Sequence, residues 1–230
     1  MKFNVVAFAI SSILLSGGAH AVDDKKPSVD IPPSNVKFDV IRGDAWNFEQ
    51  RDGITDELKS VFTLVVTDVT DKEIDVRTRS KNTSTGAETT FLQTYDRNWH
   101  RKDSGNNVYR PGQEEVGIPN DLTVGKTWKF TYEQARISPV NSFKWVGNGK
   151  VVDWEKVTLP DGQSYDAFKI QFHQQVTPVL NNHKYETDFT QWYAPSVNHF
   201  VKTYFESLTN GKVSDAGVEF LKDYQPHARE

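Results

Sequence analysis

The 230-residue chain contains no cysteine, and this absence excludes disulfide bonds, thiolate metal sites and cysteine nucleophiles. It also lacks an excess of positive charge, because 27 Lys and Arg residues stand against 31 Asp and Glu residues, for a net charge of −4. A nucleic-acid-binding surface needs concentrated positive charge, so we expect no nucleic-acid partner. With 37% hydrophobic and 25% charged residues, the chain can still bury a core.

Long apolar runs are scarce as well, and the one near the N-terminus is too short to span a bilayer. A lysine precedes this run, which covers 5–15, and an Ala-His-Ala triplet suited to cleavage ends at Ala21. We therefore predict a signal peptide over 1–21, cleaved after Ala21, followed by an extended leader over 22–36. The mature protein is expected to be periplasmic and without a membrane span. An uncleaved N-terminal anchor is the alternative.

Apolar and polar residues alternate along several segments, which is the pattern of half-buried β-strands. The alternation is clearest over 74–79, 128–133 and 168–173. Turn-forming residues between such segments predict turns at Asp52-Gly53, Gly147-Asn148-Gly149, Asp161-Gly162 and Asn210-Gly211. No ten-residue stretch has the apolar stripe of an amphipathic helix. We predict an antiparallel, all-β protein with a single domain over 37–230.

Two short motifs each occur twice, in the same order. The first motif is Gly43-x-x-Trp46-x-Phe48, which returns as Gly125-x-x-Trp128-x-Phe130. The second is Glu88-Thr89-x-Phe91-x-Gln93-x-Tyr95, which returns as Glu186-Thr187-x-Phe189-x-Gln191-x-Tyr193. The repetition predicts two duplicated antiparallel meanders, over 43–110 and 125–208. A four-stranded meander cannot cover its own apolar face, so the two are expected to share one core as a curved half-barrel or open barrel.

The C-terminal part of the chain resembles a family of exported bacterial proteins of unknown function. The likeness lies in 155–170, which carries the pattern E-x-V-T-x-P and ends in A-x-K-I, and in 192–202, which reads WYAPSVNHFVK. Asp161 stands where the family has alanine, and Asn198 replaces a glycine whose left-handed turn asparagine also tolerates. The resemblance implies a β half-barrel similar to periplasmic lipoprotein carriers, and it implies no catalytic residues.

Familiar catalytic motifs are absent, since the sequence has no G-x-S-x-G, H-E-x-x-H or P-loop pattern. His183 and Glu186 are the only close histidine and carboxylate near a strand start, and residues three apart on a strand face opposite sides. We therefore assign no catalytic residue, no metal ligand and no cofactor. Glu155, Glu186 and Asp188 lie among aromatic residues, and they are the candidates if the protein is a hydrolase with paired carboxylates.

Aromatic residues are plentiful, with 14 Phe, 8 Tyr and 6 Trp. The repeated ones, such as Trp46 and Trp128, are expected in the core. Trp145, Trp154 and Trp192 have no aromatic counterpart in the repeat, so they are the candidate ligand-binding residues. The leading hypothesis is an exported, non-catalytic binding or structural module for a hydrophobic or amphipathic small molecule, a partner segment or an envelope component. A carbohydrate or cell-wall binding module that uses the same three tryptophans is the alternative.

Overall fold

Antiparallel strands build nearly all of the described structure, which is a computed structural model covering residues 32, 39–111, 117–180, 184–209 and 211–228. The predicted signal peptide and most of the predicted leader lie outside these residues. In chain order the strands are β1 (Ala45–Asp52), β2 (Leu58–Val69), β3 (Glu73–Asn82), β4 (Glu88–Asp96), β5 (Arg101–Asp103), β6 (Asn107–Pro111), β7 (Thr127–Arg136), β8 (Asn141–Thr158), β9 (Ser164–Pro178), β10 (Tyr185–Ala194), β11 (His199–Thr209) and β12 (Lys212–Gln225). The short 3₁₀ turn η1 (Pro195–Val197) separates β10 from β11. No helix in the described ranges is long and apolar enough to cross a membrane.

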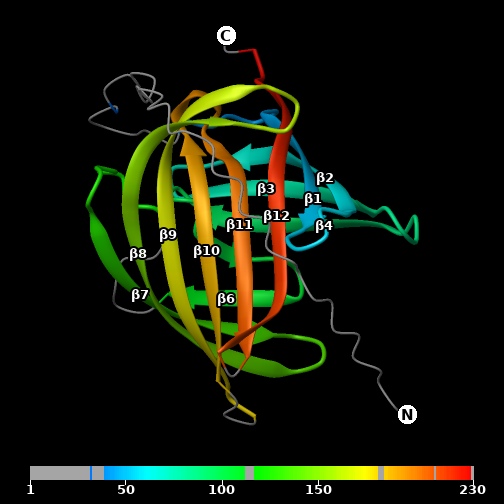
Figure 1. Cartoon of the computed structure of the whole chain (residues 1–230). Helices are drawn as coiled ribbons and strands as arrows, with labels where there is room; N and C mark the ends of the chain where they lie inside the picture. The colour runs from blue at the N-terminus through cyan, green and yellow to red at the C-terminus, as the bar shows by residue number, and fades with distance from the viewer. Residues whose placement is uncertain (1–31, 33–38, 112–116, 181–183, 210, 229–230) are drawn as a thin grey trace, which may run out of the picture.

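The sheet closes on itself because each strand pairs with its sequence neighbours and β12 returns to pair with β1 (Figure 1). The closing register runs from Ala45 opposite Gln225 to Asp52 opposite Gly217. The prediction of an all-β antiparallel protein is confirmed. The prediction of a half-barrel or open barrel is wrong, because β6 at the end of the first predicted meander pairs with β7 at the start of the second, and β12 pairs with β1 to close the remaining edge.

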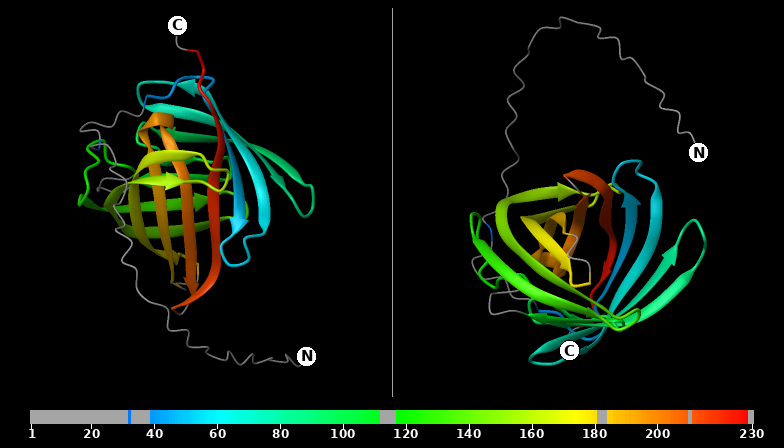
Figure 2. Two further views of the ribbon diagram at one scale, coloured as in Figure 1. Left: turned by 45° about the horizontal axis from the view of Figure 1, so that its top comes forward. Right: turned by 90° about the horizontal axis from the view of Figure 1, so that it is seen from below.

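The barrel has two walls that cross one another. The long strands β8 to β12 lie side by side at the front of Figure 1, and β2, β3, β4 and β6 run crosswise behind them. Figure 2 (right) shows the same strands from below. Because successive strands alternate in direction, the connections β1–β2, β3–β4, β5–β6, β7–β8, β9–β10 and β11–β12 all lie at one end of the barrel, here called the hairpin end.

The two predicted meanders begin in the same local way. Gly43 and Gly125 have φ angles of +98° and +94°, a region that glycine adopts far more easily than other residues. The Gly43 N–H donates to the Val66 carbonyl at 2.9 Å, and the Gly125 N–H donates to the Val151 carbonyl at 2.8 Å. Each glycine thus fixes the entry to the first strand of its meander against the second strand. The duplication of the whole meander stays a prediction.

The repeated tryptophans lie in two clusters of buried side chains at the end of the barrel opposite the hairpins. Trp46 is fully buried in the first cluster, where its Nε1–H donates to the Val197 carbonyl at 2.8 Å. Trp128 is 6% exposed in the second cluster, beside Phe130 and Tyr193. These clusters close that end of the barrel and leave its middle to the inward-facing side chains of the longer strands.

The turn predicted at Gly147-Asn148-Gly149 is wrong, because these residues lie in the middle of β8. A Cβ on Gly149 would come within 2.3 Å of the Trp128 ring, and a Cβ on Gly147 within 2.7 Å of the Phe130 ring. The glycines therefore let two rings of β7 lie directly against the β8 backbone. In this strand glycine provides space for a neighbour rather than a reversal of the chain.

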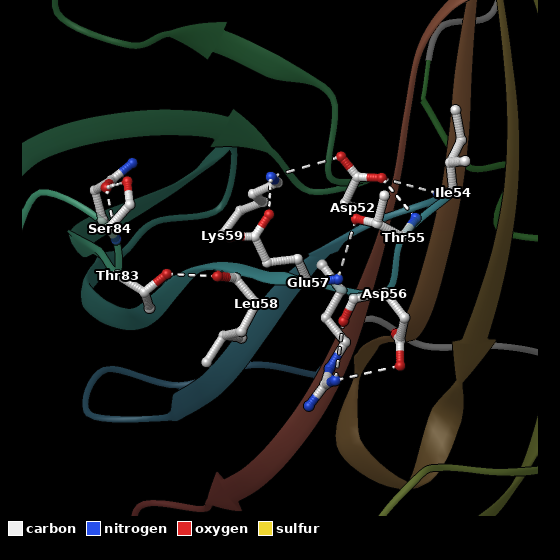
Figure 3. Close-up of polar contacts among 11 residues, drawn as sticks. Asp52, Ile54, Thr55, Asp56, Glu57, Leu58, Lys59, Thr83 and Ser84 are labelled. Atoms are coloured by element: carbon white, nitrogen blue, oxygen red, sulfur yellow. Dashed lines mark hydrogen bonds and ion pairs between the residues drawn. The ribbon is translucent and has the colours of Figure 1, made fainter. Parts of the chain in front are cut away.

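Side chains fix the β1–β2 connection at the turn predicted from Asp52 (Figure 3). Its carboxylate accepts hydrogen bonds from the backbone N–H groups of Thr55 at 2.9 Å and Ile54 at 3.0 Å, and these bonds lower the pKa of Asp52. The Thr83 hydroxyl donates to the Leu58 carbonyl and so joins this hairpin to the β3–β4 hairpin. The turn predicted at Asp161-Gly162 is also present, whereas Asn210 of the fourth predicted turn lies outside the described residues.

Candidate functional site

The inward-facing side chains leave a cavity of about 1120 Å³ inside the barrel, and every one of the twelve strands contributes to its lining. A barrel of eight strands is just wide enough to be filled by side chains or to hold one small ligand. Twelve strands enclose a wider interior. The resulting volume is slightly larger than the range for small-molecule sites, roughly 300–1,000 Å³.

The cavity wall combines aromatic and uncharged polar side chains. The aromatic lining consists of Phe48, Phe62, Phe91, Tyr95, Trp99, Tyr109, Phe130, Tyr132, Phe143, Trp145, Phe172, Tyr185, Phe189 and Phe200. The polar lining includes Gln50, Ser60, Thr78, Ser80, Thr89, Gln93, Asn107, Gln134, Gln174, Gln191 and Thr203. Ligand sites in proteins are typically apolar walls with a few placed polar groups, and this mixture suits an amphipathic molecule.

Aromatic rings and a neutral histidine form the floor of the cavity, next to the buried clusters. The His199 ring lies 4.9 Å from the Trp99 ring, 5.0 Å from the Trp46 ring and 5.4 Å from the Phe48 ring, measured between centroids. Burial lowers the pKa of His199 to about 4, so its imidazole is uncharged at neutral pH. The floor is therefore an apolar, uncharged surface.

Large aliphatic side chains are exposed on the loops at the hairpin end. Ile54 is 79% exposed on the β1–β2 connection, Val140 is 82% exposed on β7–β8, and Leu180 is 75% exposed on β9–β10. Single exposed aliphatic residues are common on protein surfaces, but these three belong to loops at the same end of one barrel. The described loops at the hairpin end thus expose more large aliphatic side chains than the loops at the opposite end do.

Three side chains bring charge into the cavity: Arg101 from β5, Arg136 from the end of β7 and Glu219 from β12. Burial raises the pKa of Glu219 to about 7, against the opposing effect of the Arg101 charge. Among the lining residues that the structure describes, Glu219 is the only carboxylate. The described cavity therefore does not bring together the two acids that a glycoside hydrolase uses.

Trp145 is the predicted ligand-binding residue that lines the cavity. Its ring stacks on that of Tyr132 at 5.4 Å, and its Nε1–H donates to Gln134 Oε1 at 3.1 Å. Trp154 lies elsewhere, packed against Phe168 at 4.6 Å beside the second buried cluster, and does not line the cavity.

Trp192 belongs to the first buried cluster and lies on the outer face of the barrel wall, since its strand neighbour Gln191 lines the cavity and successive residues of a strand face opposite sides. The Lys202 and Lys169 ammonium groups lie 4.7 and 5.3 Å from the Trp192 ring, and Nε1–H donates to Glu155 at 2.7 Å. The residue is 8% exposed. Of the three predicted tryptophans, the fold brings Trp145 alone to the cavity.

The carboxylates that the sequence offered as hydrolase candidates lie away from the cavity. Glu155 accepts the Trp192 hydrogen bond and lies 3.6 Å from the Lys169 ammonium group. Asp188 lies 2.6 Å from Nδ1 of His173 in an exposed pair. Glu186 is absent from the lining, and His183 lies outside the described residues. No cluster of three or more His, Cys, Asp or Glu residues suited to a metal ion occurs in the described ranges.

Sequence reasoning missed Arg101 and Glu219. The strand that carries Arg101 has three residues, so it offers no alternation to read. Glu219 lies between Val218 and Phe220, and a strand pattern of this kind assigns the apolar residues to the core and the acid to solvent. Phe220 is buried as the pattern predicts, but Glu219 lines the cavity instead of facing the outer solvent.

Comparison with known proteins gives similarity in fold. No family model matches the chain, and no curated protein matches it. A candidate lipoprotein from Parabacteroides distasonis superposes with a TM-score of 0.55 at 13% identity, over 84% of this chain and 100% of that one. A candidate exported protein with a YmcC-like fold from Bacteroides fragilis superposes with a TM-score of 0.52 at 11% identity, over 83% of this chain and 99% of that one. The chain shares the fold of these two proteins. This likeness agrees with the resemblance to exported bacterial proteins found in the sequence.

Proposed function

We propose that the protein is an exported, non-catalytic binding protein that holds an amphipathic small molecule inside its barrel. The observation that carries the proposal is the cavity of about 1120 Å³, lined on every strand by aromatic and uncharged polar side chains. A periplasmic location after cleavage at Ala21 belongs to the same proposal. It is supported by the order of charged, apolar and small residues at the N-terminus and by the description of one protein of the same fold as exported.

The arrangement of the tryptophans favours the cavity over a surface site for carbohydrate. A planar sugar-binding platform needs aromatic rings open to solvent. All six tryptophans lie in the described ranges, and each of them is buried or half-buried. Trp192, which the platform would need, lies beneath the two lysines that flank it. The aromatic surface available to a ligand is therefore the one inside the barrel.

Saturable binding of a neutral hydrophobic probe tests the proposal. We expect N-phenyl-1-naphthylamine to gain fluorescence on binding the folded protein at pH 7, and dodecanoic acid to displace it. The Trp145 ring faces the cavity, so its emission should be quenched as the probe binds. Replacing this ring should weaken probe binding by roughly fivefold to tenfold, since lost aromatic contact is worth about 1 kcal/mol.

The matched control lies on the same strand with its side chain on the outer face. Val146 is 45% exposed, so Val146→Ala should leave the probe affinity unchanged while Trp145→Ala lowers it. Near-UV circular dichroism of both variants must match that of the wild type, because loosened packing also binds such dyes. Absence of saturable binding to the folded wild type would show that the proposal is wrong.

A further inference from the structure

The cavity contains a charge that a purely apolar ligand would not need. Arg101 lies at the first position of β5, opposite Tyr95 of β4, and its side chain reaches the cavity lining. A guanidinium stays protonated throughout the pH range in which proteins are stable. The Arg101 side chain is exposed and lines the cavity, so its charge is open to a ligand. The partners of Arg101 therefore decide what the cavity is suited to bind.

The described side chains that hold Arg101 are all neutral. Its Nη2 donates to the Tyr95 hydroxyl at 3.3 Å, and the guanidinium lies 5.5 Å from the Tyr95 ring and 6.0 Å from the Tyr109 ring. The Gln93 amide satisfies its neighbours with its oxygen toward Arg101, which places Oε1 3.1 Å from both Nε and Nη2. These contacts fix the orientation of the guanidinium. Among the described residues these direct partners are uncharged, and none of them supplies a counter-ion.

The Arg101 charge acts on the one described carboxylate of the cavity, Glu219, and lowers its pKa against the larger effect of burial. Glu219 lies on β12, in the other wall, and burial raises its pKa to about 7, so it is only partly ionised at neutral pH and offsets the Arg101 charge only in part. Arg136 adds a second cation toward the hairpin end, where its guanidinium lies 5.4 Å from the Phe143 ring. His199 on the floor is neutral at pH 7. The cavity thus carries more positive than negative charge, and a low-dielectric wall strengthens the attraction of an anion.

From this arrangement we propose that Arg101 binds the anionic head group, a carboxylate or a phosphate, of a single-chain amphiphile whose apolar chain points toward the hairpin end. This inference rests on the proposed function, and it adds the chemical class and the orientation of the ligand. A planar guanidinium with fixed orientation can donate two parallel hydrogen bonds to either head group. Phe143 and Phe189, which line the cavity from β8 and β10, supply apolar contact for the chain.

Displacement of N-phenyl-1-naphthylamine by three twelve-carbon competitors tests the inference. Dodecanoate and dodecyl phosphate carry the anionic group, and dodecanol has the same chain without charge. We expect Arg101→Gln to lower the affinity for both anions by about tenfold to hundredfold, since a hydrogen bond to a charged group contributes at this level. The affinity for dodecanol should change by less than about threefold. Arg101→Lys should give an intermediate loss, because lysine keeps the charge but not the paired donors.

Arg110→Gln is the matched control, because Arg110 is an exposed arginine that follows Tyr109 on β6 and is absent from the cavity lining. It should leave all three affinities unchanged. Equal weakening of dodecanol and dodecanoate by Arg101→Gln would overturn the head-group inference while the proposed function stands. Failure of all three competitors to displace the probe from the wild type would overturn the proposed function itself. If Arg101→Gln lowers the affinity for one anion but not for the other, the affected anion carries the head group that Arg101 binds.

Discussion

Two titratable side chains inside the barrel, Glu219 and His199, respond to pH in opposite ways. Burial in the cavity disfavours the charged form of each, so the pKa of the acid rises to about 7 and that of the base falls to about 4. Below pH 4.5 Glu219 is neutral in both the folded and the unfolded protein. Above pH 6.5 His199 is neutral in both states. Each residue therefore destabilises the fold on one side of the pH range, and each can be isolated by a neutral replacement.

Glu219→Gln should stabilise the protein at alkaline pH. In the unfolded chain the carboxyl ionises near its ordinary pKa of 4.5, and in the fold it ionises near 7. The fold binds more protons between these values, so its stability falls as the pH rises through them. We expect the variant to gain up to about 3 kcal/mol over the wild type at pH 8 and little at pH 4.5. Urea unfolding at the two pH values measures the difference, and an equal change at both would contradict the assignment.

His199→Gln should remove part of the acid sensitivity of the fold. The unfolded imidazole takes up a proton near pH 6.5, whereas the folded one stays neutral down to about pH 4. The free energy of unfolding therefore carries no penalty from His199 above pH 6.5, and it decreases as the pH falls below that value. Between pH 7 and 4.5 the wild type should lose about 2–3 kcal/mol more than the variant. Glutamine can still donate to the Phe200 carbonyl, which the His199 ring contacts at 3.2 Å. If the free energy of unfolding of the wild type and of His199→Gln changed equally with pH, His199 would not be neutral in the fold.

At the scale of the strand, β8 shows how two glycines shape a barrel wall. The Trp128 ring occupies the space in which a Cβ of Gly149 would lie, 2.3 Å from its nearest ring atom. We expect Gly149→Ala to destabilise the protein by about 1–3 kcal/mol through overpacking. Asn148→Ala is the control, because Asn148 is the exposed neighbour on the other face of β8. Denaturant unfolding compares the two variants, and a neutral Gly149→Ala would mean that the ring moves aside without cost.

The same strand marks how far sequence alone predicts the elements. Alternation correctly places 74–79 in β3, 128–133 in β7 and 168–173 in β9, because each segment buries one face locally. Glycines at 147 and 149 read as a turn, since a local pattern cannot show that rings of another strand need their space. Arg101 escaped notice for a related reason: what distinguishes it is a set of neutral neighbours brought together by folding.

At the scale of the whole molecule, the closed barrel accounts for the remaining difference between prediction and structure. The sequence correctly indicates an antiparallel, all-β protein, and its division into two duplicated meanders stays a prediction. Closure depends on pairing between β1 and β12, which are far apart in the chain, and no local pattern reports such a pairing. Once the barrel is closed, its interior becomes a cavity instead of an exposed concave face. That is why Trp145 and Arg101 share one site although they come from β8 and β5.

The pairing of β1 with β12 also has a consequence for how the protein reaches its folded state. Ala45 faces Gln225, so the seam of the barrel joins nearly the two ends of the described chain. Non-local pairings of this kind make folding slow, because the entropy of ordering the chain between them is lost before the contacts form. Until the last strand is available, the edges of β1 and β11 stay unpaired and can pair with other chains. A chain truncated before β12 is thus expected to aggregate rather than to form a smaller barrel.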